Sequence, residues 1–244
     1  VAQHDLQDRL AFLARGISRS RPAALVEAHA AGRVELTADH GDLFARAAIE
    51  AAVVEPGRCL LPAATALDIV ATFPKDTLAL RYTEAKGKID LRCGRIRSTL
   101  TPPALAEDFP EIGLATEAPS YTVPSEALQR LIAAAGYANA PDDKRVELTG
   151  AQLKLAGNAI GLVTTDGLRL AVAQITCRGL KAARSASLVP GSFIRDLATM
   201  LGEDKQVSLW VTANRVIARC GNLTLVALPL SGTYPVYDAI VPRP

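Results

Sequence analysis

Residues 34–39 (Val34-Glu35-Leu36-Thr37-Ala38-Asp39) and residues 161–166 (Gly161-Leu162-Val163-Thr164-Thr165-Asp166) share a short apolar pattern that ends in aspartate, 127 positions apart. Three further pairs of markers recur in the same order, 125 to 128 positions apart: Leu61-Pro62 with Val189-Pro190, Cys93-Gly94 with Cys220-Gly221, and Phe109-Pro110 with Tyr234-Pro235. Nearly constant spacing over four markers predicts two tandem copies of one module. Helix-start and turn patterns that unrelated segments share are the alternative explanation.

Two helices are predicted in each copy. Asp5–Arg15 carries leucines at the i, i+4, i+7 spacing of one helix face. Its counterpart is predicted to begin at Ser125, as the N-cap, and to end at Gly136. The second helix of each copy follows Pro62 or Pro190, where a missing N–H costs nothing.

Short alternating runs between these helices predict antiparallel strands. The runs are Val34–Ala38, Leu43–Ile49, Thr77–Thr83, Lys88–Cys93, Arg97–Thr101, Gln152–Leu155, Ile160–Thr164, Arg169–Ile175, Val207–Val211, Arg215–Arg219 and Leu223–Leu228. The predicted fold class is therefore α+β, with two helices packed against antiparallel sheets in each copy.

Prolines between the copies predict a domain boundary. Pro102, Pro103, Pro110 and Pro119 interrupt regular structure, and a linker is expected near residues 111–120. The expected domains are residues 1–112, with the first strand incomplete before Val1, and residues 121–244.

Composition excludes several classes of protein. Hydrophobic residues make up 49% of the 244-residue chain and charged residues 21%, which is typical of a packed globular protein. A net charge of +2 provides no overall attraction to DNA or membranes, and aromatic residues, at 5%, are too few for base-stacking platforms. With no long apolar segment and no signal peptide, the expected location is cytoplasmic.

Catalytic and metal-binding chemistry is not expected. The four cysteines are far apart in sequence and should be buried as small apolar side chains. His4, His29 and His40, all in the first 40 residues, are expected at the surface, and no P-loop, GxGxxG, HExxH or GxSxG motif occurs. Asp39 and Asp166 lie where strands meet turns and should bind turn amides. The sequence predicts no catalytic residue, no cofactor and no metal.

Several segments resemble the first two domains of the bacterial DNA polymerase III beta subunit, the sliding clamp. Pro62 to Pro74 resembles the second helix of the family's first domain, and Cys93-Gly94-Arg95-Ile96-Arg97, with Leu105 to Pro110 after it, resembles that domain's closing strand and exit loop. Thr165-Asp166-Gly167-Leu168-Arg169-Leu170-Ala171 is similar to the family's Thr-Asp-Gly-His-Arg-Leu-Ala segment. Gly232-Thr233-Tyr234-Pro235-Val236-Tyr237 is similar to its Gly-x-Phe-Pro-Asp-Tyr segment.

The resemblance implies a non-catalytic accessory subunit of a DNA polymerase. Repeated modules would form a homo-oligomeric ring around duplex DNA, placed there by a clamp loader, and would tether DNA polymerase and other partners through short peptides. Helices would line the hole, and strands would form the outer shell and the interfaces. Topological retention of DNA needs no sequence readout and little positive charge.

Candidate site residues come from the same resemblance. The partner peptide would dock in a hydrophobic groove formed by Leu148, Thr165, Gly167, Leu168, Arg169, Leu170, Pro235 and Ile240. Leu148, Leu170 and Ile240 would supply apolar walls, Gly167 a tight turn, and the stem of Arg169 the rim. The candidates for DNA contact are Arg21, Arg145 before the central strand of the second domain, and Lys181 and Arg184 in a basic loop.

The chain departs from the family pattern at several positions. Leu168 replaces a histidine, Val236 replaces an aspartate, and Glu147 stands where an aromatic residue is frequent. Ala71 and Thr199 lie on the second helices, where basic residues are common in the family.

Length is the largest departure, because the sequence ends where a third domain would begin. A fragment and a natural two-domain clamp, three copies of which would give six modules, both remain open. A non-ring adaptor or decoy that keeps only the peptide groove is the alternative function.

Overall fold

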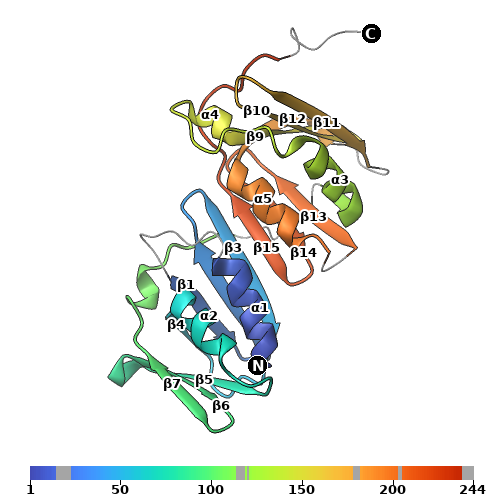
Figure 1. Ribbon diagram of the computed structural model, residues 1–244. Coiled ribbons are helices and arrows are strands. Elements are labelled where there is room, and N and C mark those ends of the chain that lie inside the picture. Colours follow the sequence, from blue (N-terminus) through green and yellow to red (C-terminus); the bar gives the residue numbers. More distant parts are fainter. Residues whose placement is uncertain (15–22, 114–118, 120, 178–181, 203–204, 238–244) are drawn as a thin grey trace. The chain divides into compact units, whose positions relative to one another are not determined.

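The computed structural model describes all residues except 15–22, 114–118, 120, 178–181, 203–204 and 238–244, and the side chains of 182–184 are also left out. The chain divides into two compact units (Figure 1). Unit 1 comprises Val1–Leu114 with Asn222–Leu225, and unit 2 comprises Ala115–Gly221 with Val226–Pro244. The predicted linker at 111–120 falls mostly outside the described residues.

Unit 1 contains two helices and two antiparallel sheets. The helices are α1 (Gln3–Ala14) and α2 (Ala63–Ala71), and short 3-10 helices lie at Glu84–Lys86 and Ala106–Asp108. One set of strands has the order β4-β1-β2-β3 and the other the order β5-β6-β7. The strands are β1 (Ala23–His29), β2 (Arg33–Asp39), β3 (Leu43–Glu50), β4 (Gly57–Pro62), β5 (Leu78–Thr83), β6 (Lys88–Cys93) and β7 (Ile96–Leu100).

Unit 2 repeats this arrangement with two additions, strand β8 and the short helix α4. The longer helices are α3 (Ser125–Ala135) and α5 (Gly191–Met200), and α4 is Val146–Thr149. The strand orders are β11-β10-β9-β12 and β15-β14-β13-β8, although the first three residues of β15 are counted with unit 1. The strands are β8 (Tyr121–Pro124), β9 (Gly150–Gly157), β10 (Ala159–Thr165), β11 (Leu170–Thr176), β12 (Ala182–Pro190), β13 (Gln206–Val211), β14 (Val216–Cys220) and β15 (Leu223–Ala227).

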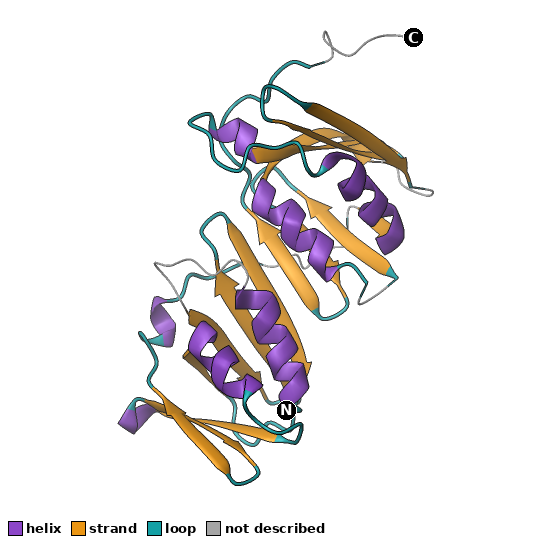
Figure 2. Ribbon diagram, viewed as in Figure 1, coloured by secondary structure: helices purple, strands orange, loops and turns teal. Residues whose placement is uncertain are grey.

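Helices and sheets pack through one face each. Helix α1 packs on β2 and β3, α2 on β1 and β4, α3 on β10 and β11, and α5 on β9 and β12 (Figure 2). The predicted leucine face of α1 is buried, and so are Leu128 and Leu131 of α3. Apolar stripes at helical spacing thus produce the α+β modules that the sequence predicts.

The tandem repeat is visible in element order and in turn geometry. Both copies run helix, four strands, helix, three strands, and their first sheets have equivalent strand orders. Asp39 pairs with Phe44 next to the β2–β3 turn, and Thr165 pairs with Leu170 next to the β10–β11 turn, so four residues lie between the members of each pair, although β3 already begins at Leu43. Asp39 therefore corresponds to Thr165, one residue before the Asp166 that the sequence pattern suggested.

Several local predictions were wrong or incomplete. Ser125 is the first residue of α3, not its cap, because β8 runs directly into the helix and Pro124 takes the N-cap position. The buried hydroxyl of Ser125 lies 4.0 Å from the Cys220 sulfur. Strands β1, β4, β8 and β12 lacked a clear alternating pattern and were missed. None of the described helices is long and apolar enough to cross a membrane.

Candidate peptide-binding site

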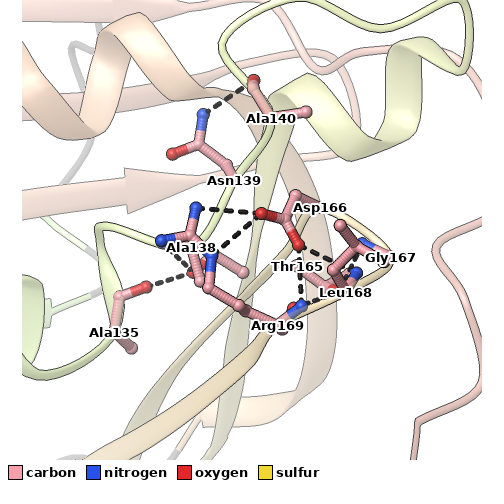
Figure 3. A network of polar contacts seen from close by, with 10 residues as sticks. Ala135, Ala138, Asn139, Ala140, Thr165, Asp166, Gly167, Leu168 and Arg169 are labelled. Atoms are coloured by element: carbon pink, nitrogen blue, oxygen red, sulfur yellow. Dashed lines mark hydrogen bonds and ion pairs between the residues drawn. The ribbon is translucent and has the colours of Figure 1, made fainter.

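The β10–β11 turn is closed by side-chain contacts to its own backbone (Figure 3). The Thr165 hydroxyl accepts a hydrogen bond from the Gly167 amide at 3.1 Å and donates one to the Arg169 carbonyl at 2.6 Å. One Asp166 carboxylate oxygen accepts hydrogen bonds from the amides of Leu168, at 2.9 Å, and Arg169, at 2.7 Å. Asp39 likewise accepts from the Gly41 amide at 2.8 Å, so the prediction that both aspartates bind turn amides is confirmed.

Charge stabilises the same turn. The second Asp166 oxygen lies 2.9 Å from both Nε and Nη2 of Arg169. The Arg169 amide, then the Leu168 amide and then the Arg169 guanidinium favour the ionised carboxylate and lower the Asp166 pKa to about 2. The Arg169 side chain is 61% exposed, so the turn holds a cation toward solvent.

Helix α4 lies against this turn. Two hydrogen bonds join α4 to the chain that precedes it. The Ala140 amide donates to the Leu148 carbonyl at 2.9 Å, and the Asn139 side chain donates to the Thr149 carbonyl at 3.0 Å. A Cβ atom on Gly167 would lie 3.3 Å from Arg145 Nη2 and 3.9 Å from a Leu148 methyl carbon. Gly167 also has φ of +88°, a backbone conformation that favours glycine.

The outer face of the β9–β12 sheet carries the segment that leaves β15. Leu230 donates its amide to the Leu188 carbonyl at 2.8 Å, and the Tyr234 hydroxyl donates to the Val163 carbonyl at 3.1 Å. Burial raises the Tyr234 pKa to about 12. A buried cluster of Val163, Leu188, Tyr234 and Tyr237 results, with Leu170 and Leu230 packed against it.

The structure brings most of the predicted groove residues into unit 2 but gives them different roles. Leu148 is only 1% exposed and lies in the core under the turn, so its place in the groove wall stays a prediction. Leu168, at the tip of the turn, is 96% exposed, and Leu170 is partly buried in the tyrosine cluster. Pro235 is exposed beside Tyr234, whereas Ile240 lies outside the described residues.

Sequence reasoning missed three residues of this region. Lys154, Val172 and Tyr237 face the same side of the sheet as Leu170, and Val172 is 49% exposed. Val236 is 82% exposed next to Pro235. The period-two alternation of side chains along β9 and β11 could have identified Lys154 and Val172. The result is an exposed apolar set on one side of the sheet, bordered by the Arg169 cation.

The DNA candidates do not form one group among the described residues. Arg21 and Lys181 lie outside those residues. Arg184 belongs to β12 rather than to a loop, because the strand begins at Ala182. Arg145 precedes α4 and donates to Asp143, with its amide nitrogen 2.8 Å from one carboxylate oxygen and Nη2 3.4 Å from the other. Its Nη2 atom also lies 3.3 Å from the Cβ position of Gly167, next to the candidate peptide site.

Other features of the described residues offer no reactive site. No group of three or more metal-ligating side chains occurs among them, and the four cysteines are buried thiols that form no disulfide. His40 is half-buried, not at the surface as predicted, and burial lowers its pKa. A cavity of about 360 Å³ lies between Gln152 and Leu188 of the sheet, the β13–β14 turn and the segment after β15, but none of the predicted groove residues lines it.

Comparison with known proteins identifies the family. Residues 122–236 match the central domain of the DNA polymerase III beta subunit. The chain is 32% identical to the beta sliding clamp of Pseudomonas aeruginosa over 204 residues (83% of this chain, 54% of that protein) and 28% identical to that of Synechococcus elongatus over 253 residues (99% and 66%). It thus spans about half to two thirds of the length of these curated relatives.

Solved structures agree with the sequence matches. The DNA polymerase III subunit beta of Pseudomonas aeruginosa superposes with a TM-score of 0.91 at 25% identity, covering all of this chain and 68% of that one. The Bacillus subtilis DNA polymerase sliding clamp has a TM-score of 0.92 at 19% identity, covering all of this chain and 67% of its own, and that likeness shows the fold. The chain belongs to the DNA polymerase III beta subunit family, the bacterial sliding clamps.

Proposed function

We propose that the chain is part of a sliding-clamp processivity factor that encircles duplex DNA and tethers a DNA polymerase through an apolar peptide site in unit 2. The role is that of a non-catalytic accessory subunit acting by shape. The observation that carries the proposal is the rigid β10–β11 turn, which holds Leu168 and Arg169 outward next to the apolar sheet face of Leu170 and Val172.

The exposed apolar side chains suit a short hydrophobic peptide. Leu168 and Val236 are almost fully exposed although both belong to backbone segments fixed by hydrogen bonds or buried tyrosines. A ligand that covers them removes apolar surface from water without having to order the receptor first. Arg169 adds a cation that can pair with a carboxylate of the peptide.

The remaining partners follow from this role. A ring that surrounds DNA needs a clamp loader to open it, and its modules must come from more than one copy of the chain. The cytoplasm, which holds bacterial DNA, is the location that the role requires. Arg145 and the strand residue Arg184 stay candidates for DNA contact, together with Arg21 and Lys181 outside the described residues.

Peptide binding is tested by fluorescence anisotropy with a labelled peptide that carries a polymerase's clamp-binding motif. Leu170→Ala and Arg169→Ala should each weaken binding. Leu105→Ala is the matched control, because Leu105 is a 63% exposed leucine in unit 1. Equal affinity for all four proteins, wild type included, would show that the groove assignment is wrong.

A non-ring adaptor is the second candidate, and the charge of the helices favours it. The four helices of eight or more residues carry five acidic side chains (Asp5, Asp8, Asp68, Glu126 and Asp196) and three basic ones (Arg9, Arg130 and Arg195). Their net charge is therefore −2 with His4 neutral. Helix faces of this sign repel phosphates and provide no electrostatic attraction to a duplex.

DNA topology separates the two candidates. A ring loaded by a clamp loader should stay on nicked circular DNA and be lost when that DNA is linearised. An adaptor should bind the same polymerase peptide, but its retention should not differ between circular and linear DNA. Such retention is either absent or lost when the salt concentration is raised. Retention that does not depend on topology would exclude encirclement and leave the adaptor role.

A further inference from the structure

Lys154 of β9 holds the segment that follows β15 through a single residue, Tyr237. Its ammonium group donates a hydrogen bond to the Tyr237 hydroxyl and lies 4.4 Å from the centroid of the same ring. Lys154 is paired with Gly161 on one side and Ala186 on the other, so it stands in the interior of the sheet. Among the described residues it has no carboxylate partner, and its charge is therefore directed at Tyr237.

The two tyrosines of this segment fix what lies between them. Tyr234 and Tyr237 are each 7% exposed, and they belong to the same buried cluster on the outer face of the sheet. Pro235 and Val236 are exposed between these two anchors. Two anchors only three positions apart leave the intervening backbone little freedom, so the pair is presented in one conformation.

Leu170 connects this segment to the candidate peptide site. It packs against the tyrosine cluster, and it begins β11 directly after Arg169. A shift of Tyr237 away from Lys154 would therefore disturb both the Pro235–Val236 pair and the apolar support of Leu170. Tyr234 would still hold the other end through its hydrogen bond to Val163.

We propose that Lys154 is a positioning residue for peptide binding, which acts by fixing Tyr237 so that the exposed Pro235 and Val236 keep one position between the two buried tyrosines. The inference rests on the proposed peptide-tethering function. Lys154 does not touch the peptide; it reduces the loss of freedom that the segment would otherwise suffer when the peptide binds. The ammonium suits this role because it fixes Tyr237 at the hydroxyl end, while the rest of the ring is buried in the cluster.

Two substitutions at one position test the role. Lys154→Met keeps the aliphatic stem and removes the charge, whereas Lys154→Arg keeps a cation over the ring. The polymerase peptide used above should bind about 3- to 10-fold more weakly to Lys154→Met and within about 2-fold of wild type to Lys154→Arg. Equal affinity of Lys154→Met and wild type would overturn the proposal.

A double-mutant cycle separates positioning from a general loss of structure. If Lys154 acts through the segment, Val236→Ala should cost less affinity in the Lys154→Met background than in wild type. Arg169→Ala is the control partner, because Arg169 is fixed by Asp166, and its effect should add to that of Lys154→Met. Additive effects for Lys154 and Val236 would contradict the inference.

Hydrogen exchange tests the structural step even if the wild-type chain binds no peptide. The amides of Val236 and Tyr237 should exchange faster in Lys154→Met than in wild type, while those of β13 and β14 stay unchanged. Failure of the wild type to bind the peptide would count against the proposed function alone. Unaltered exchange at Val236 and Tyr237 would count against the role of Lys154 alone.

Discussion

Two leucines near the β10–β11 turn should respond in opposite ways to the same substitution. Leu148 is 1% exposed and Leu168 is 96% exposed, although the resemblance to the clamp family assigned both to one groove. Leu148→Ala removes a core side chain and leaves a cavity under Gly167, which should lower the free energy of unfolding by about 2–5 kcal/mol. Leu168→Ala removes atoms that touch mainly water, so the free energy of unfolding should change by less than about 0.5 kcal/mol.

Peptide affinity should show the reverse order. If a bound peptide covers about half of the Leu168 side chain, Leu168→Ala removes roughly 1 kcal/mol of apolar burial from the complex, which weakens affinity about 5-fold. Leu148 offers no surface for a peptide to cover, so Leu148→Ala should leave affinity unchanged wherever the protein remains folded. The magnitudes thus separate a residue of the core from a residue of the binding surface.

Trp210 provides the assay, because it is the only tryptophan of the chain and lies 7% exposed in β13 of unit 2. Its fluorescence during urea unfolding reports the stability of the unit that contains both leucines, and anisotropy with the labelled peptide reports affinity. The reasoning is refuted if Leu148→Ala unfolds at the wild-type urea concentration. It is equally refuted if Leu168→Ala destabilises unit 2 as much as Leu148→Ala does.

Three further predictions concern the same unit. Asp166 has a pKa of about 2 in the folded protein against an ordinary 3.8. Its stabilising contribution is therefore complete above about pH 4 and is lost as the pH falls toward 2. The free energy of unfolding of Asp166→Asn should fall less between pH 4 and pH 2 than that of the wild type. Gly167→Ala should lower the free energy of unfolding by about 1–2 kcal/mol because of its positive φ, measured by Trp210 fluorescence, and a wild-type value would show that the turn adapts. Tyr234→Phe should cost about 1 kcal/mol, since the buried hydrogen bond to Val163 is lost while the ring stays; no change in urea unfolding would mean that this bond contributes nothing.

Sequence patterns predicted the parts of the fold that repeat or alternate. The leucine faces of α1 and α3, the helices after Pro62 and Pro190, and the two module copies follow from periodicity and spacing. β12 was missed because Ala182–Pro190 is rich in small residues and lacks a polar–apolar alternation. The one-residue error that aligned Asp39 with Asp166 arose because both apolar runs end in aspartate, whereas in the structure Thr165 makes the hydrogen bond to glycine that corresponds to that of Asp39.

The candidate site was less predictable because exposure depends on tertiary packing. Nothing in the sequence distinguishes Leu148, in the core, from Leu168, in solvent. The sequence pattern indicates only that Lys154 is a polar residue of a half-exposed strand. The structure shows that the segment after β15 packs against this strand and brings Tyr237 to Lys154. Whole-chain charge was equally uninformative, since a net charge of +2 coexists with helices that carry a net −2.

Comparison of the two copies indicates why we place the proposed peptide site in unit 2. The β2–β3 turn has the same length, the same side chain-to-glycine hydrogen bond and the same glycine φ of +88° as the β10–β11 turn. Nothing lies within 4 Å of the Cβ position of Gly41, whereas Arg145 and Leu148 approach that of Gly167. Helix α4, which unit 1 lacks among its described residues, supplies Leu148, and its N-cap residue is Arg145. The turn is thus common to both copies. In unit 2 the segment before β9, which contains Arg145 and α4, packs against this turn, and the result is a surface that is both charged and apolar.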